Sequence, residues 1–448
     1  MRPNARTADA ALLMRPDAIA AVRAYAAARG RALAACLLAT MAAFVGCSGT
    51  DSLEAGDPDD PRGAIGKADL FGSCSTADSC GDQAAEGNCW CDSACLGHGD
   101  CCADKSTVCP GGLQLATYNA GLAHGAVPFA VERLRPIIDE LRHVSADVLC
   151  LQEVWTDEDA QAIQNGLAPE FPYAIRERTI NDDSDWFACS ITQWTAIYRM
   201  NSCVDEQCSP NGISTFECAA DQCAAEWDEI DDGCKLCLAA NSTSPVKCAA
   251  WRAPMFANDG RNGLLLLSRT PLENAGYTPF ETFVIKRGVI RADIEGLQVQ
   301  CTHLTSALDV VPYPADAPYQ SWDEEHRAQV ARMAQQAGTR RHTVLLGDLN
   351  TGPASEGVDA ELPDNFQALL DAGYRDTWTA GQTCTYCQEN PLVCSKPEGC
   401  GPNIRIDHGL LKNFTADIAL SFERFADQPV PDVERLSDHY GLLATMPY

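Results

Sequence analysis

The stretch TVLLGDLN, residues 343–350, combines the two features that decide the fold. Its first half is continuously apolar, which is typical of a strand covered on both faces of its sheet. Its second half carries Asp348 and Asn350, so the apolar run ends in a carboxylate and an amide. Such strand ends open onto one edge of a sheet, where side chains from distant parts of the chain converge.

Similar apolar runs recur along the chain and alternate with amphipathic segments. The predicted strands lie in 113–120, 146–155, 263–269, 288–294, 297–304, 343–350, 406–411 and 439–446. The helical spacing of apolar residues predicts helices in 128–144, 322–337 and 365–374. Strands that alternate with helices in this way favour a layered α/β sandwich over an all-β barrel.

Eight polar side chains stand at the ends of these predicted strands. They are Asn119, Glu153, His303, Asp348, Asn350, Asp407, Asp438 and His439. Taken one at a time, each has an ordinary structural interpretation, such as the turn that Asn350 would begin. Taken together, carboxylates, amides and two histidines behind apolar strands are hard to explain by packing, so we interpret them as one site.

The residue types in this set point to metal-assisted hydrolysis of a phosphate ester. Glu153 and an amide such as Asn119 offer the hard oxygen ligands that Mg²⁺ prefers, and the metal would polarise a phosphoryl oxygen. An imidazole held by a carboxylate, here His439 with Asp407, is the expected general base for activating water.

The other strand-end residues suit the phosphate and the water. His303, as a hydrogen-bond donor or a cation, and Asn350 would hold the nonbridging phosphate oxygens. Asp348 would orient the attacking water or assist the leaving group.

The same residues stand in motifs that occur in a known order. The motifs are TYN (117–119), LQEV (151–154), TH (302–303), GDLN (347–350), RIDH (405–408) and SDH (437–439). Over 113–448 this series resembles the endonuclease/exonuclease/phosphatase superfamily. The resemblance implies a catalytic domain that is a four-layered α/β sandwich, with two packed mixed sheets flanked by helices. It also implies a divalent cation, Mg²⁺ or another such as Mn²⁺ or Ca²⁺.

The resemblance further implies a role for each residue. Asn119, Glu153 and Asp438 correspond to metal-site positions. His439 corresponds to the general base, Asp407 to its carboxylate partner and His303 to a phosphate-contacting histidine, while Asp348 and Asn350 belong to the water and phosphate region. Asn262 stands before the strand 263–269 and is either a substrate-side residue or simply a turn residue.

The substrate stays open between two classes, nucleic acid (DNA or RNA) and a phospholipid headgroup. The stretch 147–155 followed by 170–175 looks like the neutral sphingomyelinase branch, whereas the TH motif suits nuclease branches equally well. The chain has 33 basic and 62 acidic residues and a net charge of -29, which argues against a long basic groove for a polyanion. Secreted deoxyribonucleases of this fold are also acidic, so the charge does not decide.

Twenty-four cysteines predict an exported protein with disulfides. Eight of them fall in an insertion at about 180–250, which suggests four bridges, and four more fall in 384–400. We interpret the CxxC pairs Cys234/Cys237 and Cys384/Cys387 as loop-stapling cysteines rather than redox or zinc pairs. Cys150 and Cys301 lie inside apolar strands, and we interpret them as buried thiols.

A second cysteine-rich region lies at 73–110, where eight cysteines occur in an order that includes CWC (89–91), CDSAC (91–95) and CC (101–102). So short a segment needs disulfides in place of a core, which favours four bridges over a zinc site. The pattern resembles the somatomedin B module, a small disulfide-knotted unit that binds protein partners. The preceding segment 48–72 is rich in Gly, Asp and Pro and reads as a flexible linker.

The N-terminal 1–47 reads as a signal peptide, because arginines precede an apolar run that ends at Cys47. That ending resembles the bacterial lipobox, although an ordinary secretory signal is the alternative. An acylated Cys47 would anchor the chain to a membrane without spanning it. We therefore expect an exported protein, either secreted or held as a lipoprotein on the cell surface or in the periplasm.

A function of another class is a cell-surface binding or adhesion protein. In that case the somatomedin B-like module would contact a partner and the α/β part would be a non-catalytic scaffold. A scaffold of that kind usually lacks some metal or base residues, whereas this chain has all of them, so the phosphodiesterase is favoured.

Overall fold

The computed structural model describes residues between 70 and 447, and its longer gaps are 75–82, 103–111, 177–188, 209–214, 236–261, 308–312, 314–318 and 394–400. The signal segment 1–47 and the linker up to residue 69 lie outside the described residues, so both stay predictions. None of the helices within the described ranges is long and apolar enough to cross a membrane.

Two mixed sheets form the centre of the fold. The first has the strand order β11(Ser421–Phe425), β12(Gly441–Met446), β1(Leu113–Asn119), β2(Val148–Gln152), β4(Leu265–Ser268) and β3(Tyr173–Arg176). The second has the order β5(Glu273–Pro279), β6(Gly288–Ile294), β7(Leu297–His303), β8(Thr343–Asp348), β10(Asp407–Lys412) and β9(Tyr374–Asp376). The pairs β1–β2 and β7–β8 are parallel and the others antiparallel.

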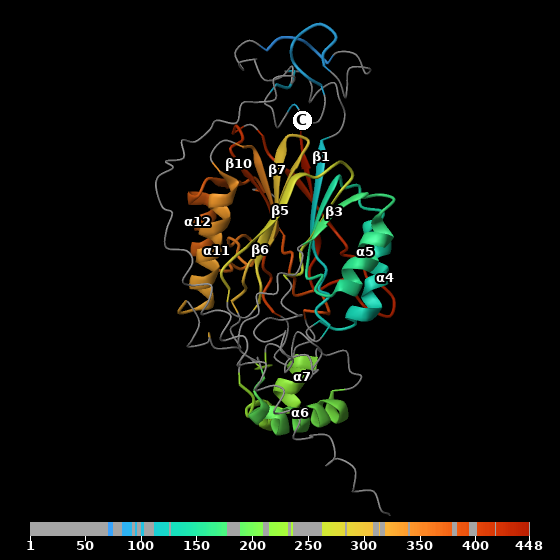
Figure 1. Cartoon of the computed structure of the whole chain (residues 1–448), viewed down its shortest axis with the longest axis vertical. Coiled ribbons are helices and arrows are strands. Elements are labelled where there is room, and N and C mark those ends of the chain that lie inside the picture. Colours follow the sequence, from blue (N-terminus) through green and yellow to red (C-terminus); the bar gives the residue numbers. More distant parts are fainter. Residues whose placement is uncertain are drawn as a thin grey trace, which may run out of the picture. The chain divides into compact units, whose positions relative to one another are not determined.

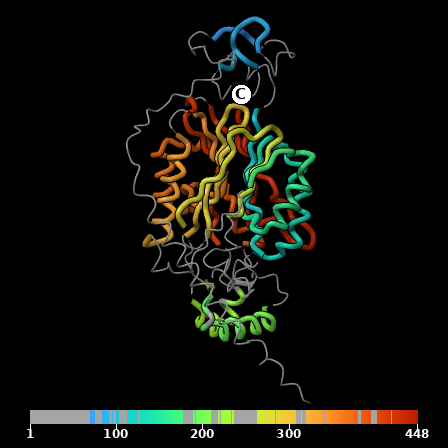
Figure 2. Tube along the Cα trace, in the orientation of Figure 1, coloured from blue at the N-terminus to red at the C-terminus, as the bar shows by residue number. Residues whose placement is uncertain are grey.

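Helices cover the outer face of each sheet (Figures 1 and 2). On the first sheet, α4(Ala130–Leu141) and α5(Asp157–Leu167) share one apolar cluster with β1, β2 and β4. On the second, α11(Trp322–Ala337) and α12(Pro363–Asp371) pack against β6, β8 and β10. A third cluster lies between the sheets. The predicted four-layered α/β sandwich is therefore confirmed.

The core between the sheets corrects one prediction. Cys150 of β2 and Cys301 of β7 are joined by a disulfide and are not free thiols. Both side chains are fully buried in the cluster between the sheets. Because strand alternation points them from opposite sheets into the same layer, their Cα atoms come within 5.5 Å, a normal disulfide spacing. The sequence pattern does not reveal this proximity, because the two cysteines are 151 positions apart.

The cysteine-rich insertion forms its own small helical core. It contains η3(Ile191–Gln193), α6(Trp194–Gln207), α7(Thr215–Gln222) and α8(Ala224–Trp227). Three disulfides, Cys189–Cys234, Cys203–Cys223 and Cys208–Cys218, join these elements. Cys237 and Cys248 lie outside the described residues, so the fourth bridge of the insertion stays a prediction.

The described cysteines of the N-terminal module are also paired. Its disulfides are Cys74–Cys91, Cys89–Cys102 and Cys95–Cys101, which favours disulfides over zinc here. Cys80 and Cys109 lie outside the described residues, and the likeness to somatomedin B stays a prediction. Further along the chain, Cys384 and Cys387 bond to each other, whereas Cys394 and Cys400 are outside the described residues.

Candidate active site

Strand register brings three of the predicted site residues to one end of the second sheet. In the parallel pair β7–β8, His303 lies opposite Asp348. In the antiparallel pair β8–β10, Asp348 lies opposite Asp407. The three residues therefore stand side by side on neighbouring strands, because β10 begins where β7 and β8 end.

Asp348 links this row to the first sheet. Its Oδ2 accepts a hydrogen bond of 2.9 Å from the side-chain amide of Asn119, the last residue of β1. The same oxygen lies 3.4 Å from Nε2 of His303 and 3.9 Å from Nε2 of His439. Burial, together with the charge of Asp407, raises the pKa of Asp348 to about 7. Asp348 therefore lies next to Asn119, His303 and His439 at once, and it can hold or release a proton near neutral pH.

His439 and Asp407 form a buried pair. Nδ1 of His439 lies 2.9 Å from Oδ2 of Asp407, and the side chains are 7% and 0% exposed. Burial alone would lower the pKa of His439, but the Asp407 carboxylate outweighs it and holds that pKa well above its ordinary value. With Nδ1 held by the carboxylate, Nε2 is the nitrogen directed to Asp348. This is the arrangement of an oriented general base.

His303 is paired with a cation, Arg287, whereas His439 is paired with a carboxylate. Nη1 of Arg287 donates to Nδ1 of His303 at 2.8 Å, which leaves the proton of the neutral ring on Nε2. Burial and the charge of Arg287 lower the pKa of His303 well below its ordinary value. Of the two roles expected for His303, the geometry favours the neutral donor over the cation. Trp155 packs beside both groups, with its ring 6.3 Å from that of His303 and 5.7 Å from the Arg287 guanidinium.

The predicted metal side lies around Glu153. The amide nitrogen of Asn119 donates to its Oε1 at 3.2 Å, while the Asn119 oxygen accepts from the backbone N–H of Gly121 at 3.0 Å. Burial, followed by the charge of Asp438, raises the pKa of Glu153. Glu153 also has a φ of 56°, a strained conformation for a non-glycine residue of the kind found at functional sites.

This donor set fits a divalent cation. Two carboxylates, Glu153 and Asp438, repel each other enough to shift a pKa, and a cation between them would relieve that repulsion. The oxygen of Asn119 keeps a second lone pair after its bond to Gly121. On the other side of the site, ligand atoms of Asp348, Asp407 and His439 also lie within 4.8 Å of one another. At that position, however, the short hydrogen bond between His439 and Asp407 favours a role in proton transfer over a role in metal binding.

The two remaining asparagines have structural contacts. The Asn350 amide donates to the carbonyl of Leu304 at 2.8 Å, and its backbone N–H donates to Asp348 Oδ1 at 2.9 Å. It therefore ties the end of β8 to the end of β7. The Asn262 oxygen accepts from the backbone of Leu264 at 2.9 Å, which is the turn interpretation.

Sequence reasoning missed three residues that build the site. Arg287 precedes β6 and looks like an ordinary surface cation in the sequence, yet it is 3% exposed. Arg133 of α4 donates to four backbone carbonyls, those of Pro128, Ala120, Gly121 and Leu436. It thereby fastens the loop after Asn119 to the segment before Asp438.

Gly121 is the third missed residue. It has a φ of 55°, and a Cβ there would lie 2.6 Å from Oδ1 of Asp438. Only glycine permits this close approach. The available signals were an arginine inside a helical repeat and a glycine two residues after a polar strand end.

The chain is similar to a known protein family and to several solved structures. The family described as Endonuclease/Exonuclease/phosphatase matches residues 116–439. No curated protein matches the chain. Among solved structures, beta toxin from Staphylococcus aureus with bound magnesium ions is 13% identical, with a TM-score of 0.45 over 75% of this chain and 99% of that one.

Two further solved structures have similar sequence identities, TM-scores and coverage. Sphingomyelinase C from Streptomyces griseocarneus is 15% identical, with a TM-score of 0.41 over 75% of this chain and 99% of that one. An AP endonuclease from Archaeoglobus fulgidus is 14% identical, with a TM-score of 0.41 over 75% of this chain and all of that one, 100%. The family match spans all eight strand-end residues of the site, from Asn119 to His439, and so the chain belongs to the endonuclease/exonuclease/phosphatase family.

Proposed function

We propose that this protein is an exported, divalent-metal-dependent phosphodiesterase in which His439 activates the attacking water. The observation that carries the proposal is the buried His439–Asp407 pair, 2.9 Å apart, whose free nitrogen faces Asp348. The family match supports the reaction class.

Proton transfer follows from the geometry of the pair. Neutral His439 keeps its proton on Nδ1, bonded to Asp407, and accepts the proton of water on Nε2. Asp348 lies 3.9 Å from that nitrogen and orients the water. As the water oxygen bonds to phosphorus, the bond from phosphorus to the leaving oxygen breaks, and the electron pair goes to that oxygen. His303 donates from Nε2 to a nonbridging oxygen, with its tautomer fixed by Arg287.

Glu153, Asp438 and the oxygen of Asn119 would hold the cation. When bound, the cation supplies charge stabilisation for the phosphoryl oxygens and lowers the pKa of the neighbouring His439 towards neutrality. Mg²⁺ suits this set because it prefers oxygen ligands and few carboxylates.

The substrate is a phosphodiester of either nucleic acid or a phospholipid headgroup. The net charge of -29 disfavours tight, non-specific contact with a long polyanion. Export is supported by the disulfides among the described residues, because disulfides are rare in reducing compartments such as the cytosol. Lipidation of Cys47 and a protein partner of the 73–110 module belong to the same proposal.

The test is a parallel hydrolysis assay of the purified full chain. Supercoiled DNA, RNA, sphingomyelin and phosphatidylcholine are each incubated with Mg²⁺, Mn²⁺ or Ca²⁺. We expect one substrate class to be hydrolysed, EDTA to abolish turnover and added Mg²⁺ to restore it. Glu153→Gln should lose metal-dependent turnover, whereas Asp139→Asn, a change on the exposed side of α4, should not. Turnover that resists EDTA, or none on any substrate, would overturn the proposal.

A further inference from the structure

The His439–Asp407 pair joins two sheets that share no strand pairing at this point. Asp407 is the first residue of β10, which pairs with β8 and β9 in the second sheet. His439 precedes β12, which pairs with β1 and β11 in the first sheet. No backbone ladder therefore sets the 2.9 Å distance between the two side chains. Another element has to hold them in register.

The segment 383–390 contacts the Asp407 side through Thr385. Its hydroxyl oxygen accepts hydrogen bonds from the backbone N–H groups of Ile406 and Asp407, both at 3.1 Å. The backbone of Tyr386 pairs with Ile404 in both directions, at 3.1 and 3.0 Å. Thr385 is fully buried. If its hydroxyl were removed, water could not take its place as the acceptor for these two backbone N–H groups.

The same segment contacts the His439 side. The backbone N–H of Tyr440 donates to the carbonyl of Thr385 at 2.8 Å. The Tyr386 ring stands edge-on to the His439 imidazole, with 5.2 Å between ring centres. In addition, the amide of Asn390 donates to the carbonyl of Ser437 at 2.8 Å. One short stretch of chain therefore holds both partners of the pair.

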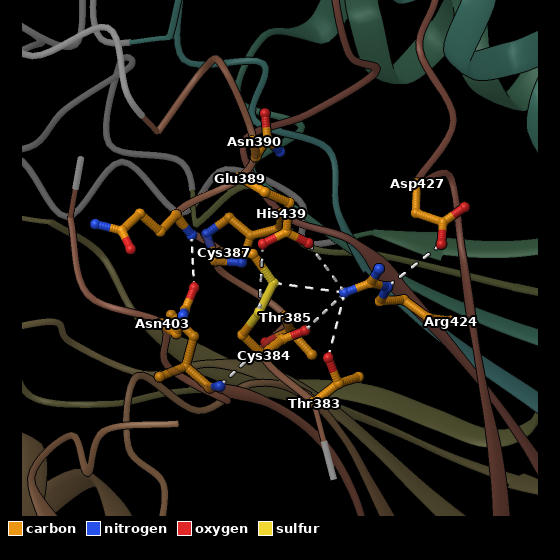
Figure 3. The surroundings of a disulfide bond; sticks show 12 residues. Thr383, Cys384, Thr385, Cys387, Glu389, Asn390, Asn403, Arg424, Asp427 and His439 are labelled. Carbon is orange, nitrogen blue, oxygen red and sulfur yellow. Dashed lines mark hydrogen bonds and ion pairs between the residues drawn. A yellow bond between two sulfur atoms is a disulfide. The ribbon is translucent and has the colours of Figure 1, made fainter. Parts of the chain in front are cut away.

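The Cys384–Cys387 disulfide closes this stretch into a ring around Thr385 and Tyr386. Figure 3 shows Arg424 directed at the ring from outside, with Thr383 and Glu389 beside it. Its guanidinium lies 3.5 Å from the Cys384 carbonyl and 3.6 Å from Sγ of Cys387. Bonded sulfurs are not thiolates and make poor metal ligands, so the nearby Glu389 does not turn this group into a metal site.

We propose that the 384–387 ring is a positioning device for the His439–Asp407 pair, with Thr385 as the positioning residue that acts through Asp407. The inference rests on the proposed function. Thr385 fixes the backbone from which the Asp407 carboxylate extends, and Tyr386 limits the rotation of the His439 ring. The disulfide keeps both residues of the ring in these contacts.

A double-mutant cycle tests the role of Thr385. Thr385→Val removes the acceptor at nearly constant volume and should lower kcat roughly 10- to 100-fold, the effect of misplacing a catalytic group. KM should not change, and Thr385→Ser, which keeps the hydroxyl, should recover wild-type kcat within about twofold. In an Asp407→Asn background, assayed at high enzyme concentration, Thr385→Val should add less than about a twofold loss.

Two results of this cycle would contradict the positioning role of Thr385. An equal loss in both backgrounds would mean that Thr385 acts on folding alone, and an unchanged kcat in Thr385→Val would also overturn the inference. Wild-type protein without metal-dependent turnover would instead refute the proposed function. Melting temperatures of all variants show how much of each loss is due to unfolding.

Removal of the ring disulfide gives a second, independent test, which also applies if Thr385→Val does not fold. Cys384→Ala combined with Cys387→Ala should lower kcat with KM unchanged. The matched control is Cys95→Ala with Cys101→Ala, which removes a short-range disulfide of the N-terminal module. If both pairs leave kcat unchanged, or lower it equally, the ring has no special role in the site.

Discussion

The two histidines on either side of Asp348 are similar in placement and opposite in chemistry. Their Nε2 atoms lie 3.9 Å and 3.4 Å from the same Asp348 oxygen, and both rings are buried. The pKa of His439 is held well above its ordinary value, whereas that of His303 is held well below it. Burial lowers both, so burial does not explain the difference.

The difference comes from what touches Nδ1 of each ring. Asp407 accepts a hydrogen bond from Nδ1 of His439, while Arg287 donates a hydrogen bond to Nδ1 of His303. A carboxylate favours a ring that can gain a proton, and a guanidinium favours a neutral ring that donates from Nε2. In the proposed mechanism, one residue type thus supplies both the base, His439, and a fixed hydrogen-bond donor, His303.

Replacing His439 should have the largest effect. His439→Ala removes the base and should lower kcat by up to roughly 10⁴-fold, the upper range for general base catalysis. The measurement is steady-state hydrolysis of the best substrate from the parallel assay. His143→Ala serves as the control, because His143 is exposed just after the end of α4, and it should retain full activity. Comparable losses in both variants would contradict the assignment.

Replacing His303 should have a smaller effect. His303→Ala removes one donor to the phosphate and should lower kcat roughly 10²-fold. Because this donor acts on charge that develops in the transition state, kcat and kcat/KM should fall together. A rise in KM at constant kcat would mean that His303 binds the ground state only.

Replacing Arg287 should change the character of His303. In Arg287→Met the pKa of His303 should rise from well below 6.5 towards that ordinary value, since a repelling charge is gone. Its ring would then become protonated as the pH falls through the raised pKa. NMR titration of the metal-free protein, with His439 as the internal reference, measures this shift. Turnover should fall roughly tenfold, in keeping with the loss of one charged hydrogen bond, and an unmoved His303 pKa would refute the pairing.

Removing the disulfide of the core should leave the asymmetry intact. Cys150→Ala with Cys301→Ala opens a loop of 151 positions and should lower the free energy of unfolding by about 4–5 kcal/mol. Both cysteines belong to the apolar cluster between the sheets, which contains neither histidine ring, so kcat at low temperature should be unchanged. Denaturant unfolding measures the first quantity, and a large drop in kcat would show coupling between core and site.

The fold was predictable where strands are buried on both faces. All eight central strands, such as β8 and β2, were expected from their apolar runs. The four edge strands, β3, β5, β9 and β11, were not, because at most one residue in each of them is buried. Contacts between residues far apart in the sequence, such as the Cys150–Cys301 disulfide, could not be predicted from the pattern of apolar residues either.

The site was predictable to the extent that its residues end strands. Asn119 and Asp348, which hydrogen-bond across 229 positions of sequence, were both expected at a common sheet edge. Arg287 and Thr385 were not, because they act through other residues and stand in no motif. The opposite roles of His303 and His439 likewise depend on neighbours that only the folded chain brings together.

Chemical rescue of His439→Ala by free imidazole tests the central claim most directly. If His439 is the base, added imidazole should restore a concentration-dependent part of the turnover in His439→Ala and none in His303→Ala, with both assays run at saturating Mg²⁺. Full turnover of His439→Ala without imidazole, or equal rescue of the two variants, would contradict the claim.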